Sequence, residues 1–144
     1  YLLNPDIEAI SIVTKLRNIT KLKVVQIDIN YYNKIWPVHN VSNASIEEFL
    51  GYIKNATYVV TNSFHCTAFS IIYNRNFFVI RKESANRRIT SMLNTIGLSN
   101  RLVDSATVSS MLNNNLLIDY DQANQALSDF VERSKQYLRL AIED

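Results

Sequence analysis

Glycine and cysteine are scarce in this chain, and each scarcity excludes a kind of site. Two glycines in 144 residues cannot build the glycine-rich loops of dinucleotide-binding folds or of nucleotide hydrolases. Cys66 is the single cysteine, which excludes an internal disulfide framework and fits a reducing compartment. His39 and His65 are the only histidines and have no acidic neighbours at ligand spacing, so no metal site is predicted.

Long apolar runs and an excess of either charge are also missing. No stretch reaches the roughly 18 apolar residues that a membrane span needs. The net charge of +2 is too small to indicate a nucleic acid or a membrane surface as partner. A hydrophobic content of 47% and a charged content of 19% are typical of one soluble globular domain. The opening, Tyr1-Leu2-Leu3, has no secretory signal, and we expect it to be the end of a strand in a longer chain.

Several segments carry apolar residues at helical spacing. The pattern predicts amphipathic helices after Pro5, after the capping-box pair Ser45 and Glu48, and around Ile89 with Gly97 at its end. Residues 66–73 are apolar nearly all round, which predicts a buried helix. A short helix is expected near 107–112. The chain should end in a long helix whose core face is formed by Ala123, Leu127, Phe130, Val131, Ser134, Leu138 and Ala141.

Between these helices lie short stretches rich in β-branched residues. They predict strands at 22–29, 57–61 and 77–80, whereas 30–43 and 98–104 are expected to be loops. Strands that alternate with helices favour right-handed crossovers and a parallel sheet. The predicted fold class is therefore α/β, a Rossmann-like three-layer sandwich in a single domain over residues 1–144.

Polar and cationic residues follow each predicted strand. Asn30, Tyr31 and Tyr32 follow the first strand, and the second is followed by Asn62, Ser63 and His65. The third is followed by Arg81 and Lys82, and by Asn86, Arg87 and Arg88 at the start of the next helix. In open parallel sheets, ligands bind beyond the carboxyl ends of the strands, where helix N-termini attract anions. This edge therefore suits a small anionic ligand that carries phosphate or carboxylate.

Each of these residues also has a purely structural interpretation. Ser63 fits an N-cap, His65 fits a hydrogen-bonded core histidine, and the arginines fit a solvated surface. Cys66 follows His65 directly, which suggests a thiolate–imidazole pair. Adjacent residues of a helix do not face each other, however, so we expect Cys66 to pack in the core.

A known family shares the segments that carry these residues. "EEFLGYIKNATYVVTNSFHCTAFSIIYNRNFFVI" resembles the signature region of the polysaccharide pyruvyl transferases, in which a strand leads to "T-x-S-F-H-G-T" and a buried helix. "NRRITSMLNTIGLSNRLV" is similar to their "N-x-R-I-x-x-L-L-x-x-L-G-L-x-x-R", and "RSKQYLRLAI" to a common ending. Cys66 stands where the family usually has glycine, a departure that puts full activity in question.

The resemblance implies the C-terminal half of a two-domain, glycosyltransferase-B-like enzyme, with its N-terminal half absent here. Such enzymes transfer the pyruvyl group of phosphoenolpyruvate to a sugar of a cell-surface polysaccharide, usually as a cyclic ketal. They act in the cytoplasm or at its membrane face, on lipid-linked or nucleotide-linked saccharides, without an organic cofactor. The residues expected to act are His65 as catalytic acid–base and, for substrate binding, Asn62, Ser63, Thr67, Arg81, Asn86, Arg88 and Arg101.

Besides a small-molecule-binding Rossmann-like domain of unrelated function, two alternatives remain open. The same sheet edge would suit the donor-binding half of a sugar-nucleotide glycosyltransferase, with Tyr31 or Tyr32 stacking on a base. A non-catalytic partner in carbohydrate biosynthesis is the other, and Cys66 is the feature that favours it.

Overall fold

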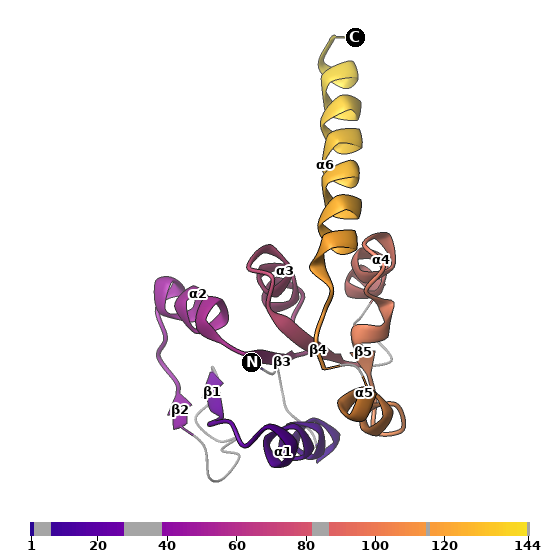
Figure 1. The fold of residues 1–144 in the computed structure, drawn as a ribbon. Coiled ribbons are helices and arrows are strands. Elements are labelled where there is room, and N and C mark those ends of the chain that lie inside the picture. Colours follow the sequence, from indigo (N-terminus) through magenta and orange to yellow (C-terminus); the bar gives the residue numbers. More distant parts are fainter. Residues whose placement is uncertain (2–6, 28–38, 82–86, 115, 144) are drawn as a thin grey trace.

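Helices and strands alternate along the chain in the computed structural model (Figure 1), which describes residues 1, 7–27, 39–81, 87–114 and 116–143. The elements are α1 (Ile7–Thr20), β1 (Val25–Ile27), β2 (His39–Val41), α2 (Ile46–Asn55), β3 (Tyr58–Thr61), α3 (Phe64–Ile72), β4 (Asn76–Ile80), α4 (Arg87–Thr95), the 3₁₀ helix η1 (Ser99–Arg101), β5 (Leu102–Val103), α5 (Val108–Asn114) and α6 (Tyr120–Glu143).

All strand pairs among the described residues are parallel. β3, β4 and β5 form one sheet in that order, and β1 and β2 form a second sheet. The α/β class and the parallel pairing predicted from the sequence are confirmed, in a layout compatible with a Rossmann-like fold. The strands of the described residues nevertheless form two sheets, whereas the sequence suggested one.

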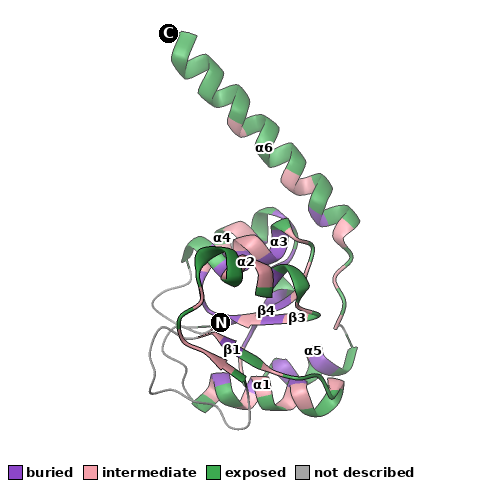
Figure 2. Cartoon of the chain, turned by 90° about the vertical axis from the view of Figure 1, so that its left-hand side faces the viewer, coloured by how far each residue is buried: buried purple, intermediate pink, exposed green. Residues whose placement is uncertain are grey.

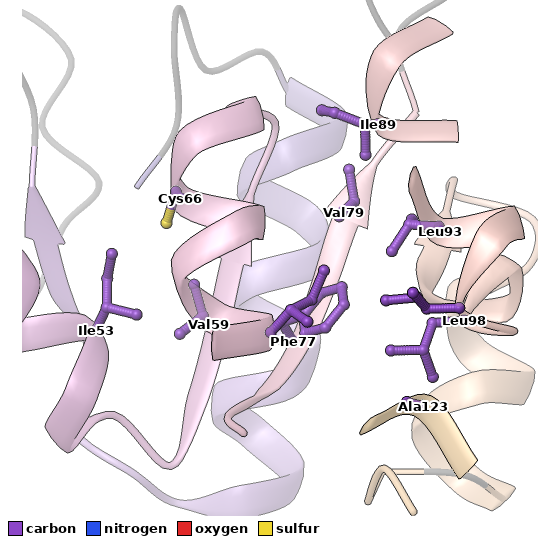
Figure 3. Packing of buried hydrophobic residues seen from close by; sticks show 11 residues of the cluster. Ile53, Val59, Cys66, Phe77, Val79, Ile89, Leu93, Leu98 and Ala123 are labelled. Atoms are coloured by element: carbon purple, nitrogen blue, oxygen red, sulfur yellow. The ribbon is translucent and has the colours of Figure 1, made fainter. Parts of the chain in front are cut away.

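Helices cover both faces of the strand layer. α2, α3 and α4 lie on one face, and α1 and α5 lie on the other (Figures 1 and 2). Each face has its own apolar core: Phe77 and Val79 of β4 pack with α3 and α4, whereas Phe78 and Ile80 pack with α1 and α5. β4 is buried on both sides, as a central parallel strand should be. Figure 3 shows the first core around Phe77.

Several helix signals in the sequence correspond to observed contacts. Ser45 caps α2: its hydroxyl accepts from the Glu48 amide at 3.2 Å, and the Glu48 carboxylate accepts from the Ser45 amide at 2.9 Å. Gly97, with φ of +72°, follows α4, and the Leu98 amide donates to the Leu93 carbonyl at 2.8 Å. Glycine tolerates this left-handed conformation, which ends the helix and turns the chain toward β5.

Two short strands lie inside segments for which the sequence predicts loops. β2 falls within 30–43, and β5 falls within 98–104. Strands of three and two residues are too short to show an alternating pattern. The predicted strand at 22–29 is confirmed at Val25–Ile27; residues 28–38 lie outside the described part of the chain.

The predicted core face of the last helix is wrong for most of its length. α6 exists, but Ala123 is its only buried residue, and Phe130, Val131 and Leu138 are exposed. The helix leaves the domain after its first turns and projects away from the other elements (Figures 1 and 2). Helical spacing reveals an apolar face but does not show what covers it. None of the described helices is long and apolar enough to cross a membrane.

Candidate functional site

The candidate site lies where β3 ends and α3 begins. Asn62 and Ser63 are both buried in this junction, and Asn62 has hydrogen-bonding or electrostatic partners of its own. Ser63 takes the N-cap position with an extended backbone (φ −92°, ψ 133°), but its hydroxyl makes no capping hydrogen bond. The sequence-based N-cap interpretation is therefore right about position and wrong about the bond.

Thr61 and Thr67 fix the backbone of Ser63 from both sides. The Ser63 amide donates to Thr61 Oγ1 at 3.0 Å, and the Ser63 carbonyl accepts from Thr67 Oγ1 at 2.8 Å and from the Thr67 amide at 3.0 Å. Thr67 is fully buried, so its hydroxyl supports Ser63 rather than reaching the surface. Among the described residues, none makes a hydrogen bond to the Ser63 hydroxyl.

His65, in the first turn of α3, has an exposed side chain. Its imidazole lies edge-to-face against the Phe64 ring, with 5.8 Å between ring centres. The exposure shows that His65 is not a core histidine, the structural interpretation that the sequence left open.

Arg88 reaches the same place from α4. Its guanidinium carbon is 5.1 Å from the centre of the Phe64 ring, which places a cation next to the aromatic ring that also contacts His65. Phe64 thus joins the first turns of two helices. The N-terminal ends of both helices add partial positive charge to this edge of the sheet.

Arg81 extends the positively charged edge beyond β4. Its amide donates to the Val103 carbonyl at 2.8 Å, and its side chain is 3.7 Å from the Asp104 carboxylate. The pKa of Asp104 is lowered, chiefly by the Thr107 amide and hydroxyl and least by Arg81. The Arg81–Asp104 pair is exposed and long, so it contributes little stability and leaves the guanidinium free to rearrange. Lys82 and Asn86 lie outside the described residues.

Arg101 is not part of this cluster. It is 2% exposed, its Nη2 donates to the Leu117 carbonyl at 2.7 Å, and its guanidinium carbon is 5.8 Å from the centre of the Phe78 ring. Residues 117–118 lie at the amino end of β4, because the Ile118 amide donates to the Asn76 side chain. The structure therefore directs the Arg101 side chain toward the edge of the sheet opposite His65.

Cys66 is buried with the α3 core, as the sequence suggested. Its sulfur lies on the side of α3 that faces Ile53 and Val59 (Figure 3). Burial raises the pKa of the thiol, an effect that the positive charge of the α-amino group at Tyr1 and hydrogen bonding with Thr61 and Ser70 partly offset. A neutral, enclosed thiol is a poor nucleophile. Because the side chain points into the core, it does not occupy the space beside the Ser63 hydroxyl.

The cluster on this edge consists of Ser63, His65 and Arg88, with Arg81 further along. Within the described ranges, no group of three metal-ligating side chains occurs. An imidazole, a hydroxyl and guanidinium groups near helix N-termini can bind an oxyanion and exchange a proton with it. Sequence reasoning missed Phe64 as the residue between His65 and Arg88. An aromatic residue in the first turn of α3 was the only signal.

Comparison with known proteins gives a match to a protein family. The family model described as polysaccharide pyruvyl transferase matches residues 2–84, more than half of the chain, including β3, α3 and β4. α4, with Arg88, lies beyond the matched range. Among curated proteins and among solved structures, nothing matches.

Proposed function

This chain belongs to the polysaccharide pyruvyl transferase family, and we propose that it forms the donor-binding half of an enzyme that uses phosphoenolpyruvate. The family is one of transferases that act in polysaccharide pyruvylation. The enzyme joins the pyruvyl group to a sugar as a ketal. It acts in the cytoplasm or at the inner face of the membrane, on a lipid-linked or nucleotide-linked saccharide, and requires no organic cofactor.

The placement of His65 and Arg88 around Phe64 is the observation that carries the proposal. A titratable imidazole and a permanent cation converge from two helices on the carboxyl edge of the sheet. Ligands of open parallel sheets bind at this edge. Imidazole titrates near neutral pH, and arginine is the side chain best shaped to hold a phosphate or carboxylate.

The two acidic groups of phosphoenolpyruvate match the donors available here. The first-turn amides of α3 and the Ser63 hydroxyl bind one oxyanion, since Thr61 and Thr67 hold Ser63 without using that hydroxyl. Arg88 binds the other oxyanion through two parallel N–H donors. Arg81 is the secondary cation, because its bond to Asp104 is weak.

His65 acts as the general acid–base. Ketal formation adds a proton to the methylene carbon of the donor and adds a sugar oxygen to the neighbouring carbon. The hydroxyl that attacks loses a proton, so the two transfers balance. Phosphate then leaves, and a second hydroxyl closes the ring and releases its proton. Such acid–base participation contributes about 10²–10⁴-fold to the rate.

The exposed apolar residues of α6 support a second domain. Phe130, Leu138 and Ile142 lie on the part of the helix that projects from the body, where no other described element covers them. An N-terminal half that packs against α6 would bury these side chains and would complete the cleft for the acceptor sugar.

Phosphate release by the full-length enzyme tests the proposal. With phosphoenolpyruvate and a panel of lipid-linked oligosaccharides, the wild type should release phosphate and form pyruvylated sugar. His65→Ala should lose at least about 100-fold in turnover while its thermal unfolding stays unchanged. His39→Ala removes the other histidine, which is exposed on β2, and should remain active. Near-wild-type turnover by His65→Ala would reject the role.

Ligand-induced stabilisation separates the proposed donor from a nucleotide sugar. Only a ligand that binds the native state raises the unfolding temperature. Phosphoenolpyruvate should raise it and a uridine diphosphate sugar should not. The reverse result would favour a sugar-nucleotide glycosyltransferase.

A further inference from the structure

A slot separates the two parallel sheets. β1 pairs with β2 on one side, and β3 pairs with β4 on one side, which leaves the other edge of each strand without a strand neighbour among the described residues. A cavity of roughly 750 Å³ lies between these two edges. Leu16 of α1 and Ile53 of α2 line it from the two helical layers, and Val25 and Val60 line it from the strands. The cavity therefore lies in the strand layer itself.

The main chain at the slot is oriented for strand pairing. The Val24 carbonyl accepts from the His39 amide of β2, so the next residue, Val25, directs its main-chain groups to the other side, into the slot. On the opposite wall, the Val60 carbonyl accepts from the α-amino group of Tyr1 at 2.9 Å. The slot is thus flanked by two strand edges, each with peptide groups that face inward.

Tyr1 already lies where such a strand would end. Its nitrogen makes the bond to Val60 that a strand amide would make, and its ring lies edge-to-face against Phe49 of α2, 5.1 Å between centres. Figure 1 shows the N-terminus between β1 and β3. The two contacts fix the position of Tyr1, and the chain after Tyr1 leads to α1 on the far side of the layer. A strand in the slot would therefore enter from the N-terminal side of Tyr1.

The handedness of the crossovers points to the same place. α3 and α4 connect β3 to β4 and β4 to β5 on one face of the layer, each step leading away from β1. α1 lies on the opposite face and leads into β1. In a sheet whose strands all run one way, right-handed crossovers on opposite faces step in opposite directions. The strand before α1 must then lie on the β3 side of β1, which is the position of the slot.

We propose that the slot is the seat of a parallel β-strand that runs into Tyr1 from its N-terminal side and joins the two sheets into one. The order becomes β2, β1, the added strand, β3, β4 and β5. The residue two positions before Tyr1 donates its amide to the Tyr58 carbonyl and accepts from the Val60 amide. Because both faces of the added strand meet apolar helices, its side chains are apolar or β-branched.

This strand would also place the candidate site at a switch point. α1 leaves the added strand on one face, and α3 leaves β3 on the other, so the crevice between their carboxyl ends opens beside Ser63. Ligands of open α/β sheets bind at such points. The inference rests on the strands and the slot alone and does not depend on the proposed reaction.

Extension of the chain ahead of Tyr1 tests the proposal. One variant carries Lys-Val-Thr-Val-Val directly before Tyr1. Its matched control carries Lys-Val-Thr-Pro-Val, which has no amide at the position that bonds to Tyr58 and is excluded from central strands. The unextended chain is the reference. Thermal unfolding and amide hydrogen exchange are measured on all three at equal monomer concentration.

The Val-containing extension should raise the unfolding temperature by at least about 5 °C. It should also slow exchange of the Val60 and Val25 amides by roughly tenfold or more relative to the Val59 amide, which faces β4. The Pro-containing extension should lose most of both effects. Equal behaviour of the extended and unextended chains, or equal gains from both extensions, would overturn the proposal.

A second, more polar extension keeps the test decisive if the first extension causes the protein to self-associate. Lys-Thr-Thr-Val-Thr retains β-branched residues and the required amide, and its partner Lys-Thr-Thr-Pro-Thr lacks that amide. The same two readouts apply. If the free peptide stabilises the unextended chain but the covalent extension does not, the strand does not enter through Tyr1, and the proposal fails.

Discussion

The guanidinium carbon of Arg88 lies 5.1 Å from the centre of the Phe64 ring. The centre of the His65 imidazole lies 5.8 Å from the centre of the same ring. One aromatic side chain therefore contacts both the candidate acid–base and the candidate anion-binding cation. Such a contact is worth about 0.5–1 kcal/mol at a partly exposed site.

Replacing Phe64 by leucine should weaken donor binding more than it weakens the fold. Loss of the ring frees Arg88 and His65, so the KM for phosphoenolpyruvate should rise about two- to fivefold, the equivalent of one cation–π contact. Phe64→Tyr should retain most of the binding. Phe69→Leu is the matched control, because Phe69 stacks on Tyr73, away from the site. Equal KM changes in both leucine variants would contradict a positioning role.

Arg88→Ala should reduce phosphoenolpyruvate affinity by about tenfold or more, since a charge-assisted hydrogen bond contributes about 1.5–3 kcal/mol. Arg88→Lys keeps the charge but loses the planar fork, and should recover only part of the affinity. Titration calorimetry measures both. Arg139→Ala, on the exposed part of α6, should bind as the wild type does. Full affinity in Arg88→Lys would show that charge alone is sufficient.

Two serine substitutions at helix N-termini should affect different properties, Ser45→Ala the stability and Ser63→Ala the donor affinity. Ser45→Ala removes a working cap and should cost about 1 kcal/mol of unfolding free energy. Ser63→Ala removes a hydroxyl that caps nothing, so it should leave stability within about 0.5 kcal/mol and reduce donor affinity. Urea unfolding and donor titration measure the two effects. A stability loss in Ser63→Ala similar to that in Ser45→Ala would contradict the assignment.

Arg101→Met should destabilise the protein by about 1.5–3 kcal/mol because it removes the charge-assisted hydrogen bond that the buried guanidinium makes to the Leu117 carbonyl. Methionine fills similar space, so cavity formation contributes little. Donor affinity of the folded protein should not change, since Arg101 lies toward the other edge of the sheet. A selective loss of donor affinity with normal stability would restore Arg101 to the site.

Cys66 should make stability depend on alkaline pH. Burial raises the thiol pKa in the folded state above its unfolded value, so the neutral thiol is favoured on folding. The contribution of this thiol to the free energy of unfolding is complete below the ordinary thiol pKa, roughly 8.5. It is lost as the pH rises through the thiol pKa of the folded state. In Cys66→Ala, the part of the stability loss at alkaline pH that comes from the thiol should be absent, while the part that comes from other groups remains. Chemical unfolding at several pH values compares the two proteins.

The sequence predicts the long elements of this fold better than its short ones. α1, α2 and α4 have a periodic apolar pattern, a capping pair or a glycine stop, α3 is apolar nearly all round, and β3 and β4 are rich in β-branched or aromatic residues; all six were found. β2 and β5 have only two or three residues, and their pairing depends on neighbours that are distant in sequence. Local patterns carry no signal for such strands.

At the candidate site, the sequence predicted correctly which end of the sheet some of the polar side chains occupy, but not which of the others turn into the interior. The strand–helix junction placed His65 and Ser63 at the carboxyl edge, because backbone topology decides that position. Arg101 and Thr67 also lie in the motifs that suggested the site, yet both side chains turn inward to main-chain carbonyls. Whether a polar side chain turns inward depends on tertiary packing, which spacing along the chain does not encode.

α6 contacts the rest of the molecule near Ala123, and the remainder of the helix projects from it. Its 24 residues give a length of about 36 Å at 1.5 Å per residue. A tilt of about 10° at its base therefore moves its tip by about 6 Å. A small repacking where α6 meets α4 would be amplified into a displacement wider than one strand spacing at the far end.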